Sequence, residues 1–143
     1  MPRLDHVAIV VEDLEAALPF FRDLLGLPLD RVADVPEEEV RVAFFPMGGG
    51  EIELVQPTTS DSGVARFLAR RGPGLHHICV EVEDLEATLR RLQAAGVQLI
   101  HEAPLIGRDG TRYAFIHPKS AFGVLVELYE RPRVKEPVVP GEG

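Results

Sequence analysis

Two histidines and two glutamates recur at equivalent positions in the two halves of this chain, His6 and Glu53 in the first half and His77 and Glu127 in the second. His77 follows His6 by 71 residues and Glu127 follows Glu53 by 74, so the two spacings nearly agree. Imidazole nitrogens and carboxylate oxygens together suit divalent metals of the Mn, Co, Ni and Zn type. A duplication that supplies one histidine and one glutamate from each copy therefore predicts a four-ligand metal site.

The elements that would carry these residues are duplicated as well. Residues 4–11 and 75–82 are rich in Val and Ile and predict strands, in which alternation places each histidine opposite the larger aliphatic side chains. Asp13 and Asp84 then predict helix N-caps, because apolar residues follow each of them at helical spacing. Pro19 lies inside the first of these helices and is expected to interrupt it.

Each half of the chain reads β-α-β-β-β. Short extended segments follow the two helices at 27–32, 40–46 and 51–56, then at 97–101, 112–116 and 123–129. The sequence therefore predicts an α+β fold, one domain over residues 1–143 made of two tandem βαβββ modules around the metal site. Module one spans 4–57 and module two spans 74–130, with a linking helix at 61–72. The tail 131–143 contains three prolines and no core-forming pattern, and is expected to be flexible.

Composition excludes several classes of function. The chain is 45% hydrophobic and 27% charged, which is ordinary for a soluble globular domain. Its formal net charge of −8 argues against binding nucleic acid or an anionic membrane, although a few local cations could still hold an anionic small molecule. No apolar run is long enough to span a bilayer. The single cysteine, Cys79, excludes an internal disulfide and fits a cytoplasmic location.

Each of these residues, taken alone, has a simpler interpretation. A strand histidine is more often an ordinary packed side chain, and a strand glutamate more often faces water. A carboxylate within an apolar strand is costly to bury without a partner, and four residues matching across a duplication favour the metal site. By alternation His76 falls on the face opposite His77, and it is expected to be structural or to support a ligand. Cys79 is expected to be a small buried residue near the site rather than a ligand or a nucleophile.

Four segments of the sequence resemble the vicinal oxygen chelate superfamily and, within it, the methylmalonyl-CoA epimerase family. These segments are Leu4–Ile9, Gly74–Ile78, Phe115–Lys119 and Gly123–Leu128. The double histidine of the second and the His-Pro-Lys run of the third are their specific parts, and the resemblance extends over residues 4–130. It implies a vicinal-oxygen-chelate (glyoxalase-like) fold, a small-molecule acyl-CoA substrate, a homodimer, and the metal ligands His6, Glu53, His77 and Glu127.

The resemblance also implies a reaction, the interconversion of (R)- and (S)-methylmalonyl-CoA through a metal-stabilised enolate by 1,1-proton transfer. Glu127 and Glu53 are the expected catalytic acid–base pair, one on each face of the planar intermediate. Some family members have glutamine at the position of Glu53. Some have a glutamate base where this chain has Val42, whose alkyl side chain cannot transfer protons. The expected cofactor is Co2+, with Mn2+, Ni2+, Zn2+ or Mg2+ as alternatives.

The phosphates of an acyl-CoA would need cationic side chains, since charge-assisted hydrogen bonds suit phosphate. Lys119 and Arg112 are the expected substrate-binding residues, and Lys119 is favoured by its place in the His-Pro-Lys turn. Arg70, Arg71 and Arg108 are further candidates. Any one of these cations, taken alone, is more often a solvated surface charge.

Other functions are compatible with parts of the pattern. A glyoxalase I-type lactoylglutathione lyase could use the same two histidines and two glutamates, but that family usually has an Asp-Pro-Asp-Gly type turn where this chain has residues 117–120, His-Pro-Lys-Ser. An extradiol dioxygenase needs two histidines and one carboxylate with open positions, and a fourth ligand at Glu53 counts against it. A metal-free antibiotic-binding module of the same fold would not need all four ligand types.

Overall fold

The computed structural model describes residues 1–107 and 109–132. Eight strands in these ranges form one mixed sheet in the order β2-β3-β4-β1-β5-β8-β7-β6. The elements, in chain order, are β1 (Arg3–Val10), α1 (Leu14–Leu18), η1 (Pro19–Leu24), β2 (Arg31–Val35), η2 (Pro36–Glu38), β3 (Val40–Pro46), β4 (Glu51–Pro57), α2 (Gly63–Arg71), β5 (Gly74–Glu81), α3 (Leu85–Ala94), β6 (Leu105–Ile106), β7 (Arg112–Ile116), η3 (Pro118–Ser120) and β8 (Val126–Glu130).

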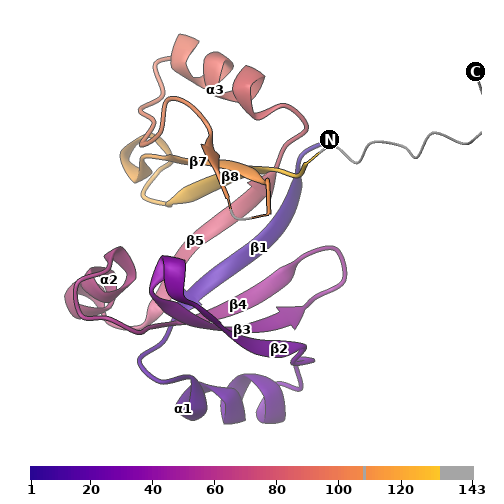
Figure 1. Ribbon diagram of the computed structural model, residues 1–143, viewed down its shortest axis with the longest axis vertical. Coiled ribbons are helices and arrows are strands. Elements are labelled where there is room, and N and C mark those ends of the chain that lie inside the picture. The colour runs from indigo at the N-terminus through magenta and orange to yellow at the C-terminus, as the bar shows by residue number, and fades with distance from the viewer. Residues whose placement is uncertain (108, 133–143) are drawn as a thin grey trace, which may run out of the picture.

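The sheet is built from two copies of one arrangement. In the first half β1 pairs in parallel with β4, and in the second half β5 pairs in parallel with β8. The two halves join where β1 and β5 run antiparallel through the centre of the sheet. In Figure 1, α1 and α3 lie at opposite ends of the molecule, with β1 and β5 crossing the region between them. The predicted α+β fold with paired β-α-β-β-β units is therefore confirmed.

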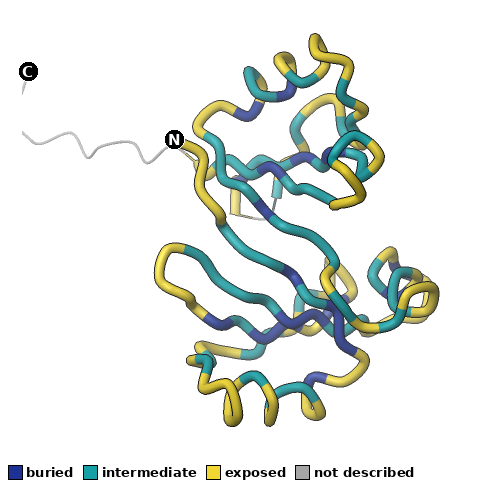
Figure 2. The backbone as a smooth tube through the Cα atoms, turned by 180° about the vertical axis from the view of Figure 1, so that it is seen from behind, coloured by how far each residue is buried: buried dark blue, intermediate teal, exposed yellow. Residues whose placement is uncertain are grey.

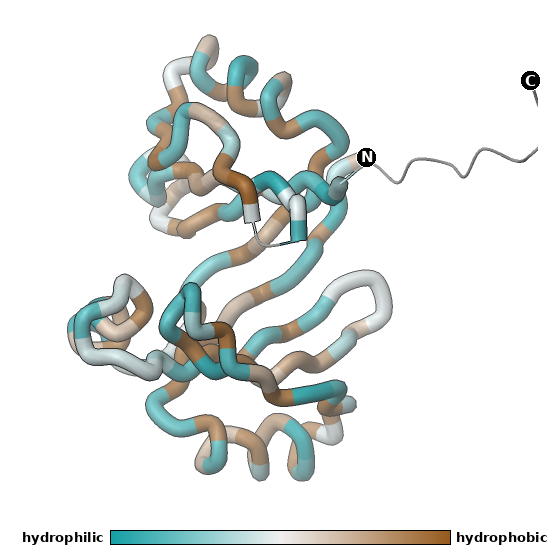
Figure 3. The backbone as a smooth tube through the Cα atoms, viewed as in Figure 1, coloured by the Kyte–Doolittle hydropathy of each residue, from teal (hydrophilic) through white to brown (hydrophobic). Residues whose placement is uncertain are grey.

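Each terminal helix packs on its own half of the sheet. Leu14 of α1 is buried against Phe45 and Leu54, and Leu85 and Leu89 of α3 are buried in the second cluster. Figure 2 shows buried segments along the strands and exposed ones along the outer sides of the helices. Apolar and polar positions alternate along the strands in Figure 3, as sheets with two different faces require. The face away from α1 and α3 is therefore free to carry the histidines and glutamates.

The ends of the helices follow the local sequence signals. The side chains of Asp13 and Asp84 accept hydrogen bonds from first-turn backbone N–H groups, so both predicted N-caps are confirmed. Ser62 caps α2 by accepting from the backbone N–H of Ala65 at 3.1 Å. The first α-helix ends at Leu18, and the chain continues from Pro19 as a π-helix, because proline has no N–H to extend the α-helical pattern.

Two of the predicted strands were wrong in position. The strand predicted at 27–32 begins later, because β2 spans Arg31–Val35. Pro28 has no backbone N–H that could donate a hydrogen bond to a neighbouring strand. The segment 97–101 makes a single bridge, between Leu99 and Ile116, and β6 comes later. The backbone N–H of Gln98 donates instead to the Ser120 hydroxyl at 2.8 Å, which takes this segment out of a regular ladder.

The predicted tail, 131–143, is described only at its first two residues, and 133–143 lie outside the described residues. Arg131 is anchored, because its guanidinium pairs with Asp5 at 3.0 Å and with Glu81 at 2.5 Å. Within the described ranges, no helix has the length and apolar character needed to cross a membrane.

Gly50 lets β4 approach β1 closely, and this contact yields a prediction. A Cβ at Gly50 would lie 2.8 Å from the Leu4 carbonyl oxygen and 3.2 Å from that of Asp5, whereas one at Gly49 would meet nothing within 4 Å. Gly50→Ala should therefore lower the free energy of unfolding by about 1–3 kcal/mol. Gly49→Ala, the matched control, should change it by less than about 0.5 kcal/mol. Urea titration of both variants checks this, and equal effects would contradict the role given to this close approach.

Candidate metal centre

The register of the four central strands brings the duplicated residues together. In β1, Ala8 pairs with Glu53 of β4 on one side and with His77 of β5 on the other. His6 lies two residues from Ala8 in β1 and therefore on the same face. Glu127 of β8 completes the group, and all four polar side chains are 13–15% exposed. The small side chain of Ala8, fully buried, leaves room between them.

The donor atoms of these residues converge. The Nε2 atoms of His6 and His77 are 3.1 Å apart, and Glu53 Oε2 is 3.0 Å from His6 Nε2. Glu127 Oε1 lies 3.3 Å from His77 Nε2 and 3.5 Å from His6 Nε2. Neighbouring ligands that are each about 2.0–2.2 Å from one ion stand roughly 3 Å apart, so this arrangement fits a divalent cation.

The convergence is tightest for three of the four groups. Donor atoms of His6, His77 and Glu127 all lie within 4.8 Å of one another, whereas Glu53 joins them through its contact with His6. The structure thus brings together all four residues that the sequence predicted as ligands, with Glu53 at the edge of the group. Three or four protein ligands on an octahedral ion leave two or three positions for substrate or water.

Neighbouring side chains orient both histidine rings. His6 Nδ1 lies 2.8 Å from Asp5 Oδ2, and Arg131 holds the other oxygen of the same carboxylate at 3.0 Å. His77 Nδ1 lies 2.8 Å from His76 Nδ1. Burial, and then the charge of His77, lower the pKa of His76 to about 4, so His76 is neutral and its Nδ1 can accept a hydrogen bond from the Nδ1–H of His77. Both ligand rings then present the Nε2 lone pair to the site, which is how metal-binding histidines are commonly held.

The electrostatics of the group favour a cation. Burial, assisted by the charges of Glu51 and Glu127, raises the pKa of Glu53 to about 7. Burial disfavours a charged His6 ring, but Asp5, Glu53 and Glu127 outweigh it and raise the pKa of His6. Carboxyls held together in this way take up protons unless a metal ion replaces those protons.

Two side chains next to the candidate ligands, Cys79 and Val42, are poorly suited to acid–base chemistry. Cys79 is fully buried, and burial, followed by the charge of Glu127, raises the pKa of its thiol. A neutral thiol of this kind is a poor ligand and nucleophile. Val42 is buried and packs in an apolar cluster with Ala8 and Val55. The alkyl side chain of Val42 therefore cannot act as an acid or a base here.

Sequence reasoning missed one carboxylate near this site. Glu38, in η2, is exposed overall, but protein atoms around its carboxyl exclude water and, with the charge of Glu127, raise its pKa. The charges of His6 and His77 also act on it, in the opposite sense. The only sequence signal was the acidic run 37–39 after Pro36, a pattern that is typical of an exposed turn.

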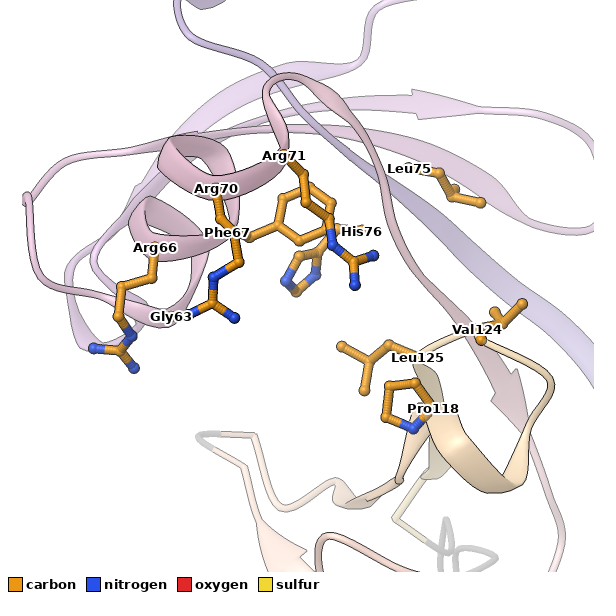
Figure 4. A pocket seen from close by; sticks show the side chains of 11 residues that line it. Gly63, Arg66, Phe67, Arg70, Arg71, Leu75, His76, Pro118, Val124 and Leu125 are labelled. Carbon is orange, nitrogen blue, oxygen red and sulfur yellow. The ribbon is translucent and has the colours of Figure 1, made fainter.

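The two predicted phosphate-binding residues lie in different surroundings. Arg112 pairs with Glu86 at 2.7 Å and with Glu130 at 3.7 Å, so its guanidinium is already engaged by carboxylates. Lys119 is exposed in η3, next to Pro118, which lines a cavity of about 330 Å³. The opposite wall of that cavity is α2, with Arg66, Arg70 and Arg71 (Figure 4). Arg108, a further candidate, lies outside the described residues.

Comparison with known proteins identifies the family. The sequence model of the Glyoxalase/Bleomycin resistance protein/Dioxygenase superfamily matches residues 5–115. An ethylmalonyl-CoA/methylmalonyl-CoA epimerase from Cereibacter sphaeroides is 43% identical over 128 residues, which cover 88% of this chain and 96% of that protein. The chain belongs to the methylmalonyl-CoA epimerase family of this superfamily.

More distant members of the family agree with this assignment. The mitochondrial methylmalonyl-CoA epimerase of Mus musculus is 40% identical over 88% of this chain and 71% of its own length. A variant of the Streptomyces coelicolor methylmalonyl-CoA epimerase in complex with 2-nitronate-propionyl-CoA superposes with a TM-score of 0.80, at 34% identity, covering 94% of this chain and 98% of that one. A lactoylglutathione lyase from Haemophilus influenzae is only 28% identical, over 91% of this chain and 93% of that protein.

The pKa of Glu53 gives a prediction for the metal-free protein. Its pKa is about 7 in the folded chain against an ordinary value of 4.5, so the folded state binds this proton more tightly than the unfolded state. The stability it contributes is present at pH 4–5 and is lost as the pH rises through 7, up to about 3 kcal/mol. Glutamine at this position cannot titrate. In chelator, wild-type protein should therefore lose stability relative to Glu53→Gln between pH 5 and pH 8.

Thermal or urea unfolding of both proteins across that pH range measures the difference. His76 contributes with the opposite sign, because its pKa is lowered, but it is present in both proteins and cancels. Stability curves that stay parallel from pH 5 to pH 8 would contradict the buried, proton-binding state of Glu53.

Proposed function

We propose that this protein is a metal-dependent epimerase that interconverts (R)- and (S)-methylmalonyl-CoA. The observation that carries the proposal is the convergence of His6, His77, Glu127 and Glu53 in a chain 43% identical to an ethylmalonyl-CoA/methylmalonyl-CoA epimerase. Two imidazoles and two carboxylates leave room on a divalent ion for a substrate that offers two oxygens.

The chemistry needs a proton acceptor on one face of the substrate and a donor on the other. A bound divalent metal would supply Lewis-acid stabilisation of the enolate, worth several kcal/mol. Glu127 removes the proton from the carbon between thioester and carboxylate, and a second carboxyl group returns a proton to the opposite face. No net proton is consumed.

The second acid–base group is Glu53. Its carboxylate lies at the edge of the ligand group, 3.0 Å from His6 Nε2, so it is the ligand best placed to leave the group and to accept or donate a proton. Glu38 is the alternative, since its carboxyl lies within the electrostatic field of the same site and its pKa is also raised. Val42 supplies no third option, because its alkyl side chain is buried among apolar residues.

The rival function is a glyoxalase I-type lactoylglutathione lyase, which could use the same ligands. Two observations favour the epimerase: the lower identity to the lactoylglutathione lyase, 28%, and the His-Pro-Lys-Ser turn at residues 117–120. Incubation with methylglyoxal and glutathione should therefore give no lactoylglutathione.

Three finer features belong to the same proposal. Co2+ is the proposed ion, with Mn2+, Ni2+, Zn2+ and Mg2+ as alternatives, because imidazole and carboxylate ligands accept all of these to different degrees. The protein is proposed to act as a homodimer in the cytoplasm, without nucleic-acid or membrane partners. The net charge of −8 and the single, buried cysteine are consistent with this.

Isotope exchange separates the two candidates for the second group. In deuterated water with added Co2+, wild-type protein should convert one isomer of methylmalonyl-CoA to the other and introduce deuterium at the reacting carbon. Glu53→Gln should slow epimerisation by about 10²–10⁴-fold, while Glu127 still exchanges the proton of one isomer. Glu38→Gln, the matched control, should stay within about threefold of wild type. NMR follows both processes, and elemental analysis verifies bound metal. Near wild-type epimerisation by metal-loaded Glu53→Gln would overturn the assignment of Glu53.

A further inference from the structure

The residue before each candidate histidine ligand is an extra residue in its strand. In the antiparallel pairing of β1 with β5, Leu4 and His6 lie opposite two consecutive residues of β5. Asp5, between them, therefore has no partner in the register and forms a β-bulge. In a regular strand successive side chains point to opposite faces, but this bulge turns the Asp5 carboxylate beside the ring that follows it. Asp5 Oδ2 thus lies 2.8 Å from Nδ1 of His6.

A second bulge, in β5, is the counterpart of the first. Two consecutive residues of β1 lie opposite His77 and Leu75, so His76 is the extra residue here. His76 follows Asp5 by 71 residues, the same spacing that relates the two ligand histidines. Strand alternation alone would separate the rings of His76 and His77, and the bulge brings their Nδ1 atoms to 2.8 Å. Each copy of the duplication therefore gives its ligand ring a hydrogen-bond partner by the same backbone device.

The two partners differ in charge. Each ligand ring offers Nε2 to the metal centre, so its Nδ1 carries the hydrogen and donates to the bulge residue. Asp5 accepts this hydrogen bond with a carboxylate, whereas an imidazole that accepts at Nδ1, as His76 does, carries no charge. A carboxylate acceptor gives a stronger, charge-assisted hydrogen bond and makes the ring a better electron donor to a metal. His6 is therefore held and polarised more strongly than His77.

A cation from the end of the second module fixes the Asp5 carboxylate. Arg131, the residue after β8, donates from Nη2 to Asp5 Oδ1 at 3.0 Å, which leaves Oδ2 for His6. The guanidinium also pairs with Glu81, whose other oxygen pairs with Arg3 at 2.6 Å. The Asp5 side chain is only 14% exposed, although the arginine reaches it from the surface. The last strand of one module thus supports the histidine ligand of the other.

We propose that Asp5 and His76 are paired positioning residues of the metal centre, and that Asp5, held by Arg131, makes His6 the stronger of the two histidine ligands. Each positioning residue acts through the ring that it orients. The inference rests on the metal dependence in the proposed function, but not on the identity of the substrate. It assigns to the duplication a pair of equivalent supports, which the difference between a carboxylate and an imidazole makes unequal.

Co2+ titrated calorimetrically into metal-free protein tests the two supports. Asp5→Ala should weaken Co2+ binding roughly 10- to 100-fold, and Asp5→Asn should weaken it less, because the amide oxygen still accepts the hydrogen bond without a charge. His76→Ala, the matched change in the second module, should weaken binding by no more than about threefold, since water can replace a neutral acceptor. Equal losses for Asp5→Ala and His76→Ala, or wild-type affinity in Asp5→Ala, would overturn the proposal.

Two arginine variants test the outer contact without changing a residue next to a ligand. Arg131→Ala should weaken Co2+ binding by about three- to tenfold, and Arg131→Lys should recover part of the loss. Arg3→Ala is the matched control, because it removes the same charge from a side chain that is likewise 56% exposed and pairs with Glu81 rather than with Asp5. This control should bind Co2+ as wild type does. Equal weakening by both alanine variants would contradict the role given to Arg131.

Proton NMR of the Co2+-loaded protein gives a readout that lower stability alone would not change. The Nδ1–H of each histidine ligand gives its own paramagnetically shifted signal, which exchanges with solvent. Asp5→Asn should move only one of the two signals, that of His6, and His76→Ala should move or remove only the other. Displacement of both signals by either change would indicate a general distortion and overturn the assignment.

Failure of this proposal and failure of the proposed function are distinguishable. If Co2+ binding follows the expected pattern but no isomer of methylmalonyl-CoA is interconverted, the positioning roles stand and the epimerase proposal fails. If isomers are interconverted but Asp5→Ala binds Co2+ as wild type does, the epimerase stands and the positioning roles fail. Wild-type protein that binds no Co2+ would contradict both.

Discussion

The architecture of this protein depends on four donor groups that meet between its central strands. The Nε2 atoms of His6 and His77 lie 3.1 Å apart in a partly buried space, Glu53 approaches His6 to 3.0 Å, and Glu127 approaches the two rings to 3.5 and 3.3 Å. Keeping two ionised carboxylates in this space is unfavourable without a positive charge beside them. The raised pKa of Glu53 shows this, because the buried carboxyl holds its proton up to a higher pH. A divalent cation removes the same cost by displacing the protons. The register of β1 with β4 and β5 thus places the candidate metal ligands beside one another.

The symmetric and asymmetric parts of the chain contribute differently. The duplicated strands supply one histidine and one glutamate from each half to the candidate metal centre, on the two sides of the β1–β5 pairing. Helix α2 lies between the two copies, and the described part of the second half has no counterpart to it. This helix carries the arginines of the neighbouring cavity.

The duplication made the fold and the four candidate ligands predictable, because strand alternation fixes the face of every second residue. It could not locate β6, since the segment before it uses the Ser120 hydroxyl and a single bridge instead of a regular ladder. Glu38 was missed because nothing in an acidic turn reveals which carboxyl lies within the electrostatic field of a site. Arg112 and Arg70 look alike in sequence, and only tertiary structure shows that Arg112 is paired with carboxylates.

Cobalt binding to the metal-free protein tests the central claim most directly. We expect one Co2+ to bind per chain by calorimetry, with an X-ray absorption spectrum of nitrogen and oxygen ligands that includes two imidazoles. Replacing either His6 or His77 by alanine should abolish stoichiometric binding, since each supplies a ligand. Failure to bind one equivalent, or a first shell containing the sulfur of Cys79, would contradict it.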